Sequence, residues 1–216
     1  TLNFKKNEKD KNIDYMYNRM RAKFKGFTEK PFRALQATNI KKNDELNLYT
    51  RAIAYHRLPD LNLAQKEINK LLELKPNDPY YNELKAQFLL ETGNPNEAIK
   101  YYNRALELEP NELLFNVGLS RALNSIGKYK STIKILKNIY DKDPRNGRLL
   151  RELAIAYSQN GELGWASLLT AERYALYGKF NDALLHAKRA QSILVPGTIA
   201  WLKVEDLILE IESINK

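Results

Sequence analysis

Hydrophobic and polar positions alternate along this chain at helical spacing, most completely between Pro79 and Pro110. Small or apolar residues there follow one another at steps of 3, 4, 5, 4, 3 and 5, namely Ala86, Leu89, Gly93, Ala98, Tyr102, Ala105 and Pro110. Residues three and four apart share one helix face, so the pattern predicts two helices with one buried stripe each. A glycine between them can end the first helix in a left-handed conformation, and Pro95 suits the first turn of the second. The segment therefore predicts a helical hairpin.

The same pattern recurs 34 residues earlier and 34 residues later. The earlier set is Ala52, Tyr55, Pro59, Ala64, Ile68, Leu71 and Pro76, and the later set is Ser120, Leu123, Gly127, Thr132, Leu136, Ile139 and Pro144. A period of 34 with a proline at the end of each unit is typical of the tetratricopeptide repeat (TPR). One hairpin cannot bury its apolar face alone, so neighbouring hairpins stack. The predicted fold class is all-α, a TPR superhelix of antiparallel helical hairpins with capping helices at both ends.

The repeat predicts the organisation of the chain. We expect a basic N-terminal arm and leading helix over residues 1–43, followed by the array over 44–216, with hairpins at about 44–76, 78–110, 112–144 and 146–177 and helices at 180–194 and 198–214. After Pro144 the pattern of Ala154 and Gly161 returns 17 residues later as Ala171 and Gly178, so one helix both closes a hairpin and opens the next.

Positive charge is concentrated at the N-terminus. Residues 1–42 contain 12 Lys or Arg and 4 Asp or Glu, whereas the remaining 174 residues contain 23 and 22, out of totals of 35 and 26. Such an arm could bind RNA, anionic lipid or an acidic protein surface. The alternative, which we favour, is that an apolar set at helical spacing forms the inner face of a leading helix whose charges are solvated; this set is Ile13, Met16, Tyr17, Met20 and Phe24. Gly26 is expected to end that helix.

Catalytic chemistry is not indicated by this sequence. There is no cysteine, and the two histidines, His56 and His186, lie in different predicted hairpins. We expect His56 in the groove or on the surface, His186 as a solvated helix residue, and no metal or cofactor for either. No apolar run reaches the length of about 18 residues that a transmembrane helix needs.

Several stretches resemble the C-terminal TPR region of bacterial envelope zinc metallopeptidases of the beta-barrel assembly-enhancing type. The resemblance is carried by the run from Asp78 to Gln87 with Leu89 to Gly93, by Leu153 to Tyr157, and by Tyr49 to Tyr55. It implies a periplasmic or envelope location, although a cytoplasmic one stays open. In that family an H-E-x-x-H helix holds zinc. This chain has no such motif, so we expect it to be a non-catalytic fragment of a longer protein.

The resemblance also implies that the first helix of each hairpin lines a concave groove for protein segments. The positions that correspond here are Tyr49, Ile53, Arg57, Tyr80, Gln87, Leu90, Val117, Arg121, Asn124, Arg148, Arg151 and Ser158. The arginines Arg121, Arg148 and Arg151 would suit a peptide with an acidic group, because guanidinium can pair a carboxylate with two hydrogen bonds. The alternative is that these arginines only keep the face hydrated.

Three functions remain open. The first is a domain that binds substrates or outer-membrane assembly machinery for the protease domain of the parent protein, and that contacts this protease domain. The second is a stand-alone TPR scaffold or co-chaperone. The third and least favoured is a protein that binds nucleic acid or a membrane surface through the basic arm, and such binding would weaken steeply with salt.

Overall fold

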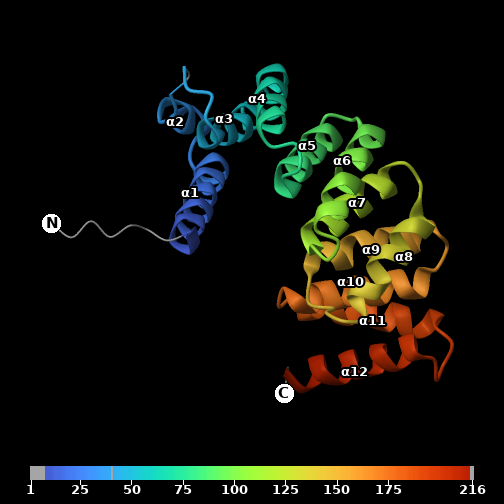
Figure 1. Ribbon diagram of the computed structural model, residues 1–216. Coiled ribbons are helices and arrows are strands. Elements are labelled where there is room, and N and C mark those ends of the chain that lie inside the picture. The colour runs from blue at the N-terminus through green and yellow to red at the C-terminus, as the bar shows by residue number, and fades with distance from the viewer. Residues whose placement is uncertain (1–7, 40, 215–216) are drawn as a thin grey trace. The chain divides into compact units, whose positions relative to one another are not determined.

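The computed structural model describes residues 8–39 and 41–214, with side chains from residue 12 onward. These residues form helices and no strand (Figure 1). The chain divides between Asn94 and Pro95 into two compact units, which we call unit 1 and unit 2. The hairpin expected over 78–110 spans this division, and each unit is described by itself.

Unit 1 contains α1 to α5 and unit 2 contains α6 to α12. Their bounds are α1 Glu8–Thr28, α2 Pro31–Gln36, α3 Glu45–Arg57, α4 Leu61–Leu74, α5 Pro79–Glu91, α6 Pro95–Leu108, α7 Leu113–Ser125, α8 Tyr129–Tyr140, α9 Gly147–Gln159, α10 Leu163–Leu176, α11 Phe180–Ile193 and α12 Ile199–Ile214. None of these helices combines the length and the apolar character that crossing a bilayer requires.

Local sequence signals account for where the helices begin and end. The Asp44 side chain accepts a hydrogen bond from the Asn47 N–H at the start of α3, and Asp78 accepts from the first N–H groups of α5. These side chains satisfy backbone donors that a helix start leaves unpaired. At the far end of α5, Gly93 has a φ of 80°, the left-handed conformation expected there. The left-handed glycine predicted at the end of the first helix of this hairpin is thus confirmed.

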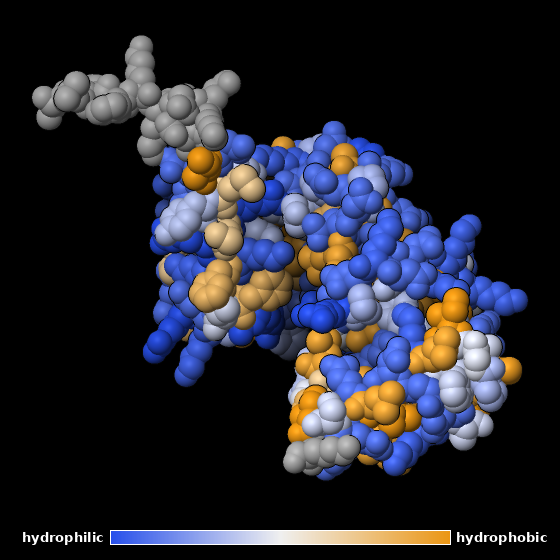
Figure 2. Space-filling view, turned by 90° about the horizontal axis from the view of Figure 1, so that it is seen from below, coloured by the Kyte–Doolittle hydropathy of each residue, from blue (hydrophilic) through white to orange (hydrophobic). Residues whose placement is uncertain are grey.

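The inner face of α1 differs from the prediction. The expected set Ile13, Met16, Tyr17, Met20 and Phe24 lies outward, with exposed fractions between 54 and 67%. Figure 2 shows these apolar side chains as a band on the surface of unit 1.

The face of α1 that packs against α3 instead carries small residues. Ala22 belongs to the unit 1 core, and a Cβ atom built on Gly26 would lie 2.9 Å from the Ile53 Cβ. Small side chains permit this close approach of two helices, so α1 continues through Gly26 to Thr28 rather than ending there.

Polar contacts hold the middle of α1. The Tyr15 hydroxyl donates to Glu45 Oε1 at 2.6 Å, and the Lys75 ammonium lies 2.8 Å from Glu45 Oε2. Tyr81 also donates to this carboxylate. Arg19 pairs with Asp78 at 2.6 Å. Burial raises the pKa of Glu45, but the hydrogen bonds from Lys75, Tyr15 and Tyr81 lower it by more, so the pKa of this carboxyl group lies below its usual range.

Unit 2 is a series of helices in which each packs against the next in sequence, from α6 to α12. Its larger core cluster joins α7, α8, α9 and α10 through Val117, Leu136, Leu149, Leu153 and Leu169. A second cluster joins α10, α11 and α12, and alanines dominate its buried set. Small residues let these last helices pack closely.

Candidate peptide-binding cavity

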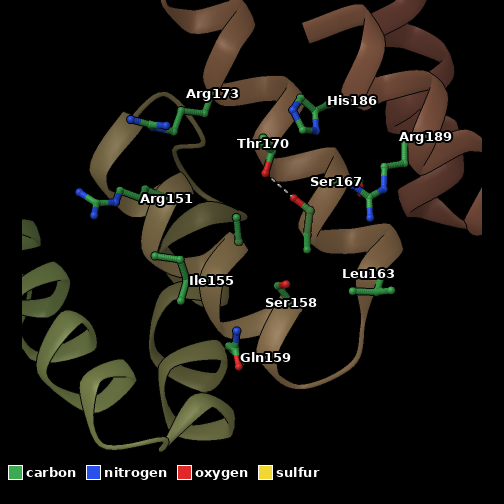
Figure 3. A pocket seen from close by; sticks show the side chains of 12 residues that line it. Arg151, Ile155, Ser158, Gln159, Leu163, Ser167, Thr170, Arg173, His186 and Arg189 are labelled. Atoms are coloured by element: carbon green, nitrogen blue, oxygen red, sulfur yellow. Dashed lines mark hydrogen bonds between the residues drawn. The ribbon is translucent and has the colours of Figure 1, made fainter. Parts of the chain in front are cut away.

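An open cavity of about 360 Å³ lies on the surface of unit 2 where α9, α10 and α11 meet (Figure 3). We call it the α9–α11 cavity. It is lined from α9 by Arg151, Ala154, Ile155, Ser158 and Gln159, from α10 by Leu163, Ala166, Ser167, Thr170 and Arg173, and from α11 by His186 and Arg189.

Helical periodicity explains why α9 contributes one face to this cavity. Asn146 caps the helix by accepting from the N–H groups of Arg148 and Leu149. The stripe that includes Leu149 and Leu153 is buried in the core of unit 2. Arg151, Ile155 and Ser158 are four and three residues apart and therefore share the opposite side of the helix.

The cavity is positively charged. Its lining includes three arginines and a histidine, and none of the lining residues is Asp or Glu. In Figure 3 the guanidinium groups of Arg151 and Arg173 lie at one end, Arg189 lies at the other, and His186 lies between them. Arg151 has a distant acidic neighbour, since its Nε is 4.0 Å from Glu152 Oε1.

The polar groups around the cavity differ in how well they are satisfied. The Thr170 hydroxyl donates to the Ala166 carbonyl oxygen at 2.7 Å. The Arg173 guanidinium carbon lies 5.5 Å from the centre of the Tyr177 ring, a cation–π distance, yet its buried Nε has no hydrogen-bond partner among the described residues. His186 stacks on Tyr174 with ring centres 5.4 Å apart, so this histidine is half-buried rather than the solvated residue expected.

In unit 1 the structure covers the predicted groove face of α3. Tyr49 and Ile53 are 1% and 0% exposed within the core. Arg57 donates to the carbonyl oxygens of Gly26 and Glu29 at 2.7 and 2.6 Å. These hydrogen bonds join the C-terminal end of α1 to α3. The binding face expected at these three residues is therefore occupied by the chain itself, because α1 packs there.

The remaining unit 1 positions lie on α5 and are half-buried. Tyr80 has the Arg19 guanidinium carbon 5.1 Å from its ring centre, and Gln87 donates to Glu91 at 3.0 Å. Leu90 is also half-buried. His56, on α3, stacks on Phe88 with ring centres 4.0 Å apart, and burial lowers its pKa despite the nearby carboxylate of Glu91.

In unit 2 the predicted residues separate into three groups. Val117 is in the core, and Asn124 is buried because its side chain donates to the Glu152 carbonyl oxygen at 2.9 Å. Arg121 and Arg148 are exposed but do not line the cavity. Of the twelve predicted positions, only Arg151 and Ser158 lie in it.

Two arginines and one histidine of the cavity were not among the predicted positions. Arg189 lies 34 residues after Ile155 and 68 after Arg121, so the repeat period could have found it. Arg173 carries no such signal, because α10 packs against both α9 and α11 and departs from the 34-residue pattern. His186 carries none either, because the residue 34 positions earlier is the buried Glu152. No group of three His, Cys, Asp or Glu in the described part of the chain is placed to hold a metal ion.

Comparison with known proteins fits this helical-repeat architecture. The profile of the Tetratricopeptide repeat family matches residues 1–192. The chain therefore belongs to the tetratricopeptide repeat family, an all-α fold that is typically non-catalytic and generally mediates protein–protein interaction. No curated protein matches the chain.

Solved structures that resemble the chain share its fold at low sequence identity. The crystal structure of MamA has a TM-score of 0.57 at 17% identity, covering 76% of this chain and 95% of MamA. PilW, described as a widely conserved type IV pilus biogenesis factor, has a TM-score of 0.56 at 21% identity, covering 93% of this chain and all (100%) of PilW. A tetratricopeptide repeat protein from Parabacteroides merdae has a TM-score of 0.54 at 16% identity, covering 95% and 87%.

Proposed function

We propose that this chain is a protein-interaction domain that holds an extended segment of a partner protein in the α9–α11 cavity. The observation that carries the proposal is the open cavity on the side of α9 that, as the family resemblance implies, lines a groove for protein segments. Ile155, Leu163 and the alanines of the lining offer apolar contacts, and Ser158 and Gln159 offer hydrogen bonds. Eight of the twelve lining residues are polar, so the cavity suits an extended segment whose main chain and side chains can form hydrogen bonds along it.

A selection from a random peptide library tests this proposal. The immobilised full chain would be compared with Ser158→Trp, which places an indole in the cavity. The matched control is Ser213→Trp, at an exposed position of α12 outside the cavity. We expect enriched peptides that bind the normal chain and Ser213→Trp equally and lose most of their affinity for Ser158→Trp. A library that yields no binder, or binders indifferent to Ser158→Trp, would refute the proposal.

The context of this binding rests on the sequence resemblance. The similarity of the Asp78 to Gly93 stretch to the TPR region of envelope zinc metallopeptidases supports a domain that presents substrates or outer-membrane assembly components to a protease in the periplasm. The family match is equally consistent with a stand-alone TPR scaffold. In the first case zinc belongs to the protease domain, and no residue of this chain is assigned to it.

The coding sequence of the gene separates these two contexts. An H-E-x-x-H motif encoded upstream in the same reading frame would support the protease context. A complete reading frame without that motif would contradict it and leave the stand-alone scaffold. Fusion of the full reading frame to alkaline phosphatase would test the location, because that enzyme is active only after export from the cytoplasm.

A further inference from the structure

We propose that one end of the α9–α11 cavity is a carboxylate site, formed by Arg151 and Arg173, which recognises an acidic group of the bound segment. This inference rests on the proposed function and names the chemistry of its ligand. The carboxylate could be the C-terminus of the partner or an Asp or Glu side chain within it.

The charge of the lining is the first argument. Arg151, Arg173 and Arg189 line a cavity to which no Asp or Glu contributes. Glu152, whose Oε1 lies 4.0 Å from the Arg151 Nε, is itself engaged, because its Oε2 accepts from the Asn124 amide at 3.2 Å. A concave surface with one sign of charge concentrates ligands of the opposite sign.

The hydrogen-bonding state of Arg173 is the second argument. Its Nε is buried and has no partner within the described chain. A buried donor without an acceptor costs free energy, and a small rotation of the Arg173 side chain that brings Nε–H to a ligand oxygen would remove that cost. The Tyr177 ring, whose centre lies 5.5 Å from the Arg173 guanidinium carbon, stabilises the positive charge. It does not accept a hydrogen bond from Nε, whose N–H lies in the plane of the guanidinium.

The arrangement of the two arginines is the third argument. α9 and α10 pack against each other, and Figure 3 shows the two guanidinium groups at the same end of the cavity. A guanidinium presents a planar fork of N–H donors that matches the two oxygens of a carboxylate. Beyond this end, Ile155 and Leu163 line the cavity and suit the carbon chain of a peptide.

Nuclear magnetic resonance of the Arg173 Nε–H group tests the site directly. The probes are three short peptides added to the full chain: acetyl-Ala-Ala-Ala with a free carboxyl end, acetyl-Ala-Glu-Ala-amide, and acetyl-Ala-Ala-Ala-amide as the neutral control. We expect a saturable downfield shift of the Arg173 Nε–H with one or both acidic peptides and none with the amide. The first two probes distinguish a C-terminal from a side-chain carboxylate. Equal shifts with all three, or a shift with inorganic phosphate alone, would overturn the proposal.

Variants then connect the resonance to binding. The strongest peptide from the library selection, made with its acidic group intact, should bind Arg173→Gln and Arg151→Gln about tenfold more weakly, as expected for loss of a charge-assisted hydrogen bond. Arg173→Lys keeps the charge and loses the fork, so it should recover only part of the affinity. The matched control is Lys188→Gln, which removes one positive charge from α11 outside the cavity and should bind normally.

The outcomes separate this inference from the proposed function. If Ser158→Trp abolishes binding while Arg151→Gln and Arg173→Gln bind normally, the cavity binds peptide but the carboxylate site is wrong. If Ser158→Trp also binds normally, the proposed function itself fails. Circular dichroism of each variant shows whether the helices are retained, and Arg173→Lys keeps the test decisive if Arg173→Gln unfolds.

Discussion

Lys85 offers a quantitative test of the packing in unit 1. It lies on α5 with only 3% of its surface exposed, and its ammonium donates to the Asn69 side-chain oxygen at 2.8 Å. Burial disfavours the charged form and lowers the pKa of Lys85 from 10.5 to about 8. We predict that Lys85→Met stabilises unit 1 at neutral pH.

The pKa difference sets the magnitude of this effect. The difference of 2.5 between 10.5 and 8 corresponds to about 3 kcal/mol, at about 1.36 kcal/mol for each pH unit. The substitution also removes the hydrogen bond to Asn69, which is worth about 1 kcal/mol. The expected net gain at pH 7 is therefore about 2 kcal/mol. Between pH 8 and 10.5 the unfolded chain binds more protons at Lys85 than the folded chain, so the stability of the normal protein rises with pH in that interval.

Urea unfolding followed by circular dichroism measures the effect. The free energy of unfolding of the normal chain and of Lys85→Met would be compared at pH 7, 8.5 and 9.5. At pH 9.5 the tyrosines of the unfolded chain, with pKa values near 10, begin to ionise, and taking the difference between the two chains cancels that contribution. We expect the advantage of Lys85→Met to shrink as pH rises, whereas Lys66→Met, at an exposed position of α4, should show no such trend. An advantage that is absent, or that does not change with pH, would refute the reasoning.

Three further substitutions test other contacts. Arg57→Ala removes both hydrogen bonds to the end of α1, so it should speed amide hydrogen exchange in the last two turns of α1 and lower the free energy of unfolding by about 1–3 kcal/mol. Unchanged exchange would contradict the packing of α1 over α3. Gly118→Ala should cost about 1–3 kcal/mol in urea unfolding, because the added Cβ would lie 2.4 Å from a ring carbon of Tyr102; an unaffected stability would show that the ring moves aside. The lowered pKa of Glu45 contributes stability that is present above its unfolded value of 4.5 and is lost as pH falls through the folded value. The free energy of unfolding should therefore fall more steeply with decreasing pH for the normal chain than for Glu45→Gln. Parallel acid profiles of the two chains would exclude this contribution.

The helices could be predicted because their signals are local. Asp44 and Asp78 cap backbone groups two or three residues away, and Gly93 adopts a conformation that its own missing side chain permits. The face of α1 could not be predicted in this way. Its stronger apolar stripe is exposed, whereas Ala22 and Gly26 pack on α3 because they are small, and hydropathy alone does not register size.

The candidate site could be predicted only in part for a related reason. A repeat period assigns positions within a unit, so it reached Arg151 and Ser158 and could have reached Arg189. It does not state what packs over each unit, and α1 covers the equivalent positions Tyr49 and Ile53. Arg173 enters the cavity from α10, outside the positions that the period assigns to ligand contact.

The central claim is that unit 2 binds a partner segment in the α9–α11 cavity. The most direct measurement is a titration of the isotopically labelled full chain with the strongest library peptide, following backbone amide resonances. The account predicts that the largest shifts fall on residues of α9, α10 and α11 that line the cavity, including Arg151, Ile155 and Ser158. Shifts confined to the exposed apolar band of α1, or to α12, would contradict it.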